Sequence, residues 1–128
     1  MSIREVLTFT KGSKKQCSWA YDILDEAFAN LDNMENYIRK LDSYDAGHGE
    51  KLAGYTYAQV DEVRRFLNCC CESEQFKNAE HVINMGGQLD FDHLHDLVMS
   101  TLRANKVWDA NSKQWICLLY TSDAADEL

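Results

Sequence analysis

The chain has 128 residues, of which 45% are hydrophobic and 27% charged, and it contains no proline. This length suits one domain with a modest core, and no apolar run approaches the roughly 18 residues of a membrane span. The formal net charge of -8 argues against nonspecific binding of nucleic acid, which needs an excess of Lys and Arg to neutralise phosphates.

Cysteine usage indicates a reducing compartment. Three of the five cysteines are consecutive, at Cys69, Cys70 and Cys71, and adjacent cysteines on a helix point in different directions, so they do not form a disulfide framework. The N-terminus also lacks the basic and then apolar pattern of a signal peptide. We therefore expect a cytoplasmic protein with no membrane partner.

Residues 2–10 fit two structures. Val, Thr and Phe dominate the second half of this segment, which favours an edge strand. Ser2 and Glu5 have the spacing of a capping box, which would allow a short helix instead. We predict the strand, and Lys11 and Gly12 end either element.

Residues 13–42 are predicted to form one continuous helix around which the chain is organised. Apolar residues recur every seven positions over residues 17–38 and, on a second register, over residues 20–41. Ser13 and Gln16 have capping-box spacing at the start. An apolar stripe of this length needs a second long helix or a second copy of the chain to cover it, so we also expect a homodimer or a higher oligomer.

Residues 43–55 are predicted to be a flexible loop, because Gly47, Gly49 and Gly54 interrupt them. The glycine spacing matches neither the dinucleotide fingerprint nor the phosphate-binding loop.

The next helix begins at Thr56, which has capping-box spacing to Gln59. Its apolar stripe drifts to a neighbouring face after about four turns, which either a wide apolar face or a break near Ser73 would explain. We predict one helix that runs to Met85 and packs antiparallel against the first, because residues 72–75 contain no Gly or Pro.

A third helix is predicted after Asp90 or Asp92, either of which can cap it. Its expected buried face consists of Phe91, Leu94, Leu97, Val98 and Leu102. Residues 107–116 then read as a β-hairpin that could pair with the N-terminal strand. The predicted fold is mainly α: a long antiparallel helical hairpin plus a third helix, with a small β element, in a single domain over residues 1–116.

Residues 117–128 (CLLYTSDAADEL) resemble the translated read-through of a transposase-type adapter used to prepare sequencing libraries. Such strings end many incomplete environmental reading frames. We therefore exclude this tail from the domain as not native and expect its deletion to leave stability unchanged. We also expect that the natural C-terminus is missing and that the gene comes from a metagenome.

Two groups of residues could carry chemistry, and neither meets the geometry required. The acids and histidines from Asp90 to Asp96 are dense, but His93 and His95 lie about 200° apart on a helix and cannot share a metal. Cys69, Cys70 and Cys71 lack the C-x-x-C spacing of zinc or redox sites. We predict no metal and no cofactor.

A few basic and aromatic residues could gather around an anionic ligand such as a small nucleotide. This weak candidate ligand-binding set is Arg64, Arg65, His48, Lys51 and Trp108. A second candidate set, for contact with a partner protein, is the acidic group on the first long helix: Asp22, Asp25, Glu26 and Asp32.

Because no acid/base, nucleophile or cofactor arrangement emerges, we predict a binding protein that is not an enzyme. The preferred hypothesis is stoichiometric binding of a host protein, as phage- or mobile-element-encoded inhibitors of bacterial defence systems do, since these are often short, acidic and without motifs. The alternatives are a sponge that sequesters a signalling nucleotide, a cysteine- or metal-dependent enzyme, and a winged-helix-like regulator. The last is disfavoured because its would-be recognition helix begins with acidic residues.

Overall fold

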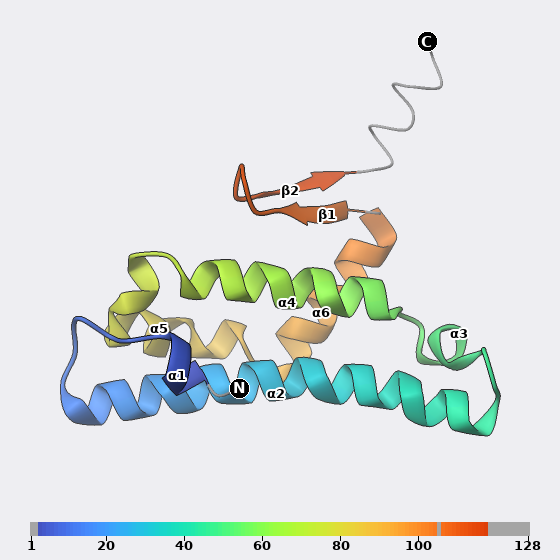
Figure 1. Cartoon of the computed structure of the whole chain (residues 1–128), viewed down its shortest axis with the longest axis horizontal. Helices are drawn as coiled ribbons and strands as arrows, with labels where there is room; N and C mark the ends of the chain where they lie inside the picture. The colour runs from blue at the N-terminus through green and yellow to red at the C-terminus, as the bar shows by residue number, and fades with distance from the viewer. Residues whose placement is uncertain (1–2, 105, 118–128) are drawn as a thin grey trace, which may run out of the picture.

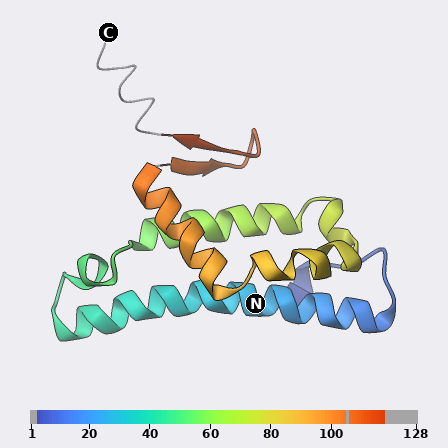
Figure 2. The ribbon, with the colours of Figure 1, turned by 180° about the vertical axis from the view of Figure 1, so that it is seen from behind.

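The computed structural model describes residues 3–104 and 106–117, and its fold is mainly helical with a small two-stranded antiparallel sheet, as predicted (Figure 1). The long helix α2 (Lys14–Tyr44) lies along one side of the molecule and α4 (Tyr57–Cys71) runs antiparallel beside it. Helices α5 (Ala79–Met85) and α6 (Phe91–Ala104) cover the face opposite α1 (Ile3–Val6), which Figure 2 shows from behind.

Helix α2 is continuous over 31 residues, which confirms the prediction for residues 13–42. Ser13 accepts a hydrogen bond from the backbone of Gln16 at 3.1 Å, and the Gln16 side chain accepts one from the Ser13 amide at 2.9 Å, so the predicted capping box forms. The buried side chains recur at helical spacing and are Ala20, Leu24, Ala27, Leu31, Met34 and Ile38.

Neighbouring elements of the same chain cover this stripe, since α2 contacts α1, α3, α4, α5 and α6. The described residues therefore bury the apolar face of α2 without a second copy. The homodimer stays a prediction, because covering the apolar face of α2 does not by itself require a second copy.

Residues 3–6 form the short helix α1, so the predicted strand over residues 2–10 is wrong. The side chains of Ile3, at the start of α1, and Leu7, directly after its end, are four residues apart and are both buried against the core. The Ile3 amide donates to Asp25 at 3.3 Å, and the Tyr21 hydroxyl donates to the Leu7 carbonyl at 2.7 Å. Residues four apart also share one face of a strand, so the burial of these two side chains fits either structure. The helix is favoured because the Asp25 carboxylate caps its first turn by accepting from a backbone amide that has no partner within the helix.

The predicted loop over residues 43–55 contains a short helix, α3 (Gly49–Ala53), which is a second correction. Asp42 organises this corner, because its carboxylate accepts from the Gly49 amide at 2.5 Å and from the Tyr57 hydroxyl at 3.3 Å. A Cβ atom at position 49 would lie 2.4 Å from the carbonyl oxygen of Ile38. Only glycine allows the chain to pass this close to α2.

Helix α4 ends at Cys71, so the predicted continuation to Met85 is wrong and the alternative, a break near Ser73, is correct. The Ser73 hydroxyl and amide both donate to the Cys70 carbonyl, at 2.6 and 3.0 Å, and thereby compete with helical hydrogen bonding. A short 3₁₀ turn, η1 (Gln75–Lys77), buries Phe76 before α5 begins, and a second, η2 (Gly86–Gln88), follows α5.

The N-terminal segment forms hydrogen bonds with backbone groups that lie between α4 and α5 and at the start of α5. The amides of Thr10 and Lys11 donate to the Lys77 carbonyl at 2.8 and 3.2 Å, and the Ala79 amide donates to the Lys11 carbonyl at 3.0 Å. We call residues 8–12 the N-terminal strap. It ties the start of the chain to the start of α5.

Helix α6 starts after Asp90, whose carboxylate accepts from the His93 amide at 2.9 Å, as predicted for a cap. Its buried face consists of Leu94, Val98 and Thr101, whereas Phe91 and Leu102 are exposed, which corrects two of the predicted core positions.

The predicted β-hairpin forms from β1 (Lys106–Asp109) and β2 (Gln114–Cys117), and Trp108 pairs with Trp115 across it. The hairpin does not pair with the N-terminal segment as proposed, because it packs on α4 through the Phe66 ring, whose centroid lies 4.9 Å from that of Trp108. The adapter-like tail lies outside the described residues except for Cys117. No helix in the described part of the chain is long and apolar enough to cross a membrane.

Candidate functional site

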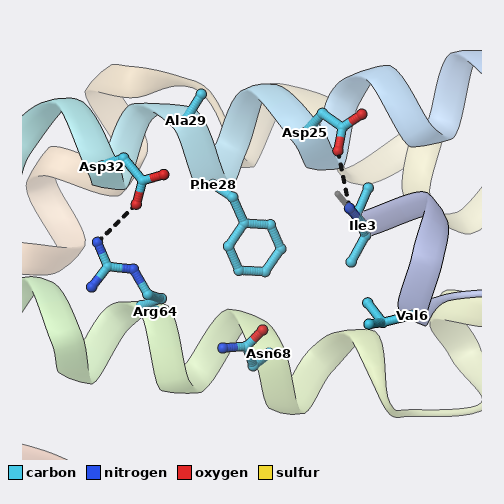
Figure 3. A pocket seen from close by; sticks show the side chains of 8 residues that line it. All are labelled: Ile3, Val6, Asp25, Phe28, Ala29, Asp32, Arg64 and Asn68. Carbon is cyan, nitrogen blue, oxygen red and sulfur yellow. Dashed lines mark hydrogen bonds and ion pairs between the residues drawn. The ribbon is translucent and has the colours of Figure 1, made fainter. Parts of the chain in front are cut away.

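A groove of about 330 Å³ lies where α1 meets the gap between α2 and α4. It is lined by Ile3, Val6, Asp25, Phe28, Ala29, Asp32, Arg64 and Asn68. Figure 3 shows the Phe28 ring reaching from α2 toward α4, with Asp25 on one side of it and Asp32 on the other. The structure thus brings together residues from both candidate sets, and we call this feature the acidic groove.

The guanidinium of Arg64 is occupied by carboxylates. It contacts Asp32 at 3.0 Å and Glu35 at 3.4 Å, and it also forms an ion pair with Asp61 in the preceding turn of α4. Glu35 is shared with Arg39 at 2.7 Å. Three carboxylates around one mostly covered guanidinium leave no excess positive charge for a phosphate, so this arrangement does not suit an anion.

The apolar part of the groove is held by α1. The Phe28 side chain is half-buried and packs against the core, and it lines the groove together with the exposed Val6. Asp25 fixes the helix by accepting from the Ile3 amide. Aromatic faces attract cations, and the carboxylates on either side add to that attraction.

The remaining acidic candidates extend the negative charge over the outward side of α2. Asp22 and Glu26 are exposed, and at about 100° per residue they adjoin the arc that holds Asp25 and Asp32. Residues 22–32 contain these four acidic residues and no Lys or Arg. The acidic groove is therefore the edge of a larger acidic surface.

The structure does not gather the candidate ligand-binding set. His48 and Lys51 belong to the corner at α3, whereas Arg64 lies about two turns into α4. His48 contacts Asp45 at 2.9 Å, and the Arg65 side chain, which is largely exposed, contacts Glu62 at 3.3 Å.

Trp108 also stands apart from the bases, because it is buried beneath the β-hairpin. Its amide donates to Glu62 at 2.8 Å, while its indole Nε1 has no hydrogen-bond partner in the part of the chain that the structure describes. The ring contacts Phe66 and Trp115, so its faces are already used in packing.

The cysteines and histidines take structural positions. Burial raises the pKa of Cys70 to about 11 and that of Cys71 to about 12, so thiolate is scarce at neutral pH. Within residues 3–104 and 106–117, no group of three or more His, Cys, Asp or Glu side chains is arranged to hold a metal ion. His93 instead bonds with the carboxylate of Asp90, which raises the pKa of the imidazole.

Sequence reasoning missed the apolar residues of the groove. Neither Phe28 nor Val6 is in the two candidate sets predicted from the sequence, but both line the groove. The usable signal was the spacing of Asp25, Phe28 and Asp32, which places an aromatic ring between two acids on one helical flank. Neither the position of α1 nor that of Asn68 at the groove leaves such a signal, because both depend on which helices meet.

Comparison with protein-family models, with curated proteins and with solved structures found no match.

Proposed function

We propose that this protein works by stoichiometric binding, without catalysis, and that its partner is a protein with a basic surface. The observation that carries the proposal is the acidic groove, where a half-buried aromatic ring lies between two carboxylates. The aliphatic stem of a Lys or Arg side chain can lie over Phe28 while its charged head reaches Asp25 or Asp32.

The acidic surface around the groove supports the same partner class. Four acidic residues without an intervening base attract a basic surface during encounter, which raises the association rate at low salt. Trp19, which is exposed on the same helix one turn before Asp22, adds a residue type that is enriched at the energetic centre of protein interfaces.

The proposed setting is the bacterial cytoplasm, with inhibition of a defence protein by a phage- or mobile-element-encoded inhibitor. The support is analogy with other short, acidic chains without motifs. The nucleotide sponge gains no support from the geometry, because carboxylates surround Arg64 and the other candidate bases lie elsewhere.

The test begins with capture of partners from a bacterial lysate and continues with calorimetry on the purified partner. The double change Asp25→Asn and Asp32→Asn should weaken binding about tenfold and reduce its salt dependence. The matched control, Asp92→Asn and Asp96→Asn, removes the same charge from exposed positions of α6 and should change affinity by less than about twofold.

Equal losses in both double variants would show that net charge alone, and not the groove, governs binding. Calorimetry with cyclic and linear nucleotides tests the competing function. Tight binding of any nucleotide, abolished by Arg64→Glu or Arg65→Glu, would replace the proposed function with sequestration.

A further inference from the structure

A second cavity, of about 360 Å³, lies on the flank of α2 opposite the acidic groove. It is formed where α2, the end of α3 with the segment that follows it, and the first two turns of α6 meet, and Figure 2 shows α6 starting beside α2 on that face. We call it the aromatic cavity. It lies within the size range of small-molecule and side-chain pockets.

Rings line most of the aromatic cavity. Tyr55 is buried, and its hydroxyl donates to the Met34 carbonyl at 3.3 Å. The His95 ring packs edge-on to Tyr55, with centroids 5.7 Å apart, and stacks on Phe91 at 5.8 Å. These contacts hold the rings in place, so the cavity is preorganised.

The mouth of the cavity is apolar and open. Phe91 and Tyr37 are 46% and 48% exposed, and both line the cavity. Burial, and then the neighbouring Tyr37, raises the pKa of Tyr55, so the phenol stays neutral at physiological pH. None of the described residues that line the cavity is Asp, Glu, Lys or Arg.

Two polar groups remain available among these rings. The side chains of Asn33 and His95 line the cavity, and neither has a hydrogen-bond partner in the described ranges. The Asn33 amide can both donate and accept, and the neutral imidazole offers one donor and one acceptor. Together they can match a ring that carries its own N–H or ring nitrogen.

We propose that the aromatic cavity binds a planar, uncharged nitrogen heterocycle, stacked against Phe91 and Tyr37 and hydrogen-bonded by Asn33 or His95. The ring can belong to a tryptophan side chain of a partner or to a nucleoside. This site is independent of the acidic groove, so its failure leaves the proposed function untouched.

The test uses N-acetyltryptophanamide and adenosine as probes, with binding followed by protein-observed NMR. At least one probe should saturate the Phe91 and Tyr37 ring signals below about 10 mM, as expected for a fragment-sized molecule. Phe91→Ala and Tyr37→Ala should each weaken that binding about tenfold or more. Tyr44→Ala, which removes a more exposed tyrosine seven residues along α2, should leave it within about twofold.

Circular dichroism of each variant checks that it is folded. We expect all three variants to fold, because each substituted side chain is partly exposed. Preference for N-acetyltryptophanamide identifies a protein side chain as the source of the ring, and preference for adenosine identifies a nucleoside. If neither probe saturates, or if Tyr44→Ala weakens binding as much as Tyr37→Ala, the assignment of the cavity is overturned.

Discussion

The two flanks of α2 differ in chemistry although they share one buried seam. On the flank toward α1 and α4, ionised side chains pair with one another around Phe28. On the flank toward α3 and α6, the lining is aromatic and uncharged. The difference shows that the elements packed beside a helix, and not the helix alone, decide whether its edge recognises charge or shape.

The largest expected effect comes from a substitution in the buried seam of α2, which should disrupt both flanks together. Leu31 is fully buried in the seam, so Leu31→Asp should cost at least about 3–5 kcal/mol, because an unpaired carboxylate would lie in an apolar core. Urea unfolding followed by circular dichroism measures the loss. Asn36→Asp, at an exposed position of the same helix, is the control, and an unchanged midpoint for Leu31→Asp would remove this residue from the core.

The next change separates the two flanks. A Cβ atom on Gly49 would collide with the Ile38 carbonyl and the Asp42 carboxylate, so Gly49→Ala should destabilise the protein by about 1–3 kcal/mol. Because this corner precedes Ala53 and Tyr55, NMR signals of the aromatic cavity should shift more than those of the acidic groove. Gly87→Ala, where a Cβ atom meets nothing within 4 Å, should be nearly neutral.

A smaller effect is expected on the charged flank alone. Arg64→Gln leaves Asp32 and Asp61 without their shared cation and should cost about 1 kcal/mol at low salt and less at high salt. Unfolding in low and high sodium chloride measures this. Arg65→Gln removes a more exposed guanidinium that forms an ion pair with Glu62 and should cost about half as much or less. Equal costs would show that the cluster around Arg64 contributes no more than a surface pair.

The smallest effect concerns pH at the start of α6, on the aromatic flank. Hydrogen bonds from His93 lower the pKa of Asp90, and the Asp90 carboxylate raises the pKa of His93 above its ordinary value of 6.5. The His93 contribution is complete below 6.5 and is lost as pH rises through the raised value. The Asp90 contribution is present above its ordinary value of 3.8 and is lost as pH falls through the lowered value.

Both contributions therefore coexist from about pH 3.8 to 6.5, where the first turn of α6 should be best protected from hydrogen exchange. An NMR titration of the His93 ring measures its pKa directly. Asp90→Asn should return that pKa toward 6.5. If the pKa does not move, the contact between these two side chains is absent in solution.

The sequence specified the helices whose signals are local. Helix α2 begins with the capping box of Ser13 and Gln16, and α4 begins with the cap Thr56, so each start signal lies within a few residues of the helix that it caps. The apolar spacing of α2 also repeats without interruption. These features could be predicted because a helix of this length is stabilised by its own periodicity and ends.

Elements that depend on distant partners could not be predicted in the same way. The break after Cys71 has no Gly or Pro, and part of its backbone bonds to Thr10 and Lys11 from the other end of the sequence. Helix α1 likewise depends on Asp25. The groove was only half predicted: the sequence identified Asp25, Asp32 and Arg64 as candidates, but nothing in it showed that α4 would leave the Phe28 ring partly uncovered.

The N-terminal strap also bears on the order of folding. Its hydrogen bonds to Lys77 and Ala79 close a loop that contains both α2 and α4. The entropic cost of closing this loop is smallest once α2 and α4 have already paired, because the remaining flexible segment is then short. Contacts of such large sequence separation contribute little to an early nucleus, which local helical contacts dominate. We therefore expect the strap to dock late in folding, and its hydrogen-bonded amides to exchange with solvent earlier than those in the middle of α2.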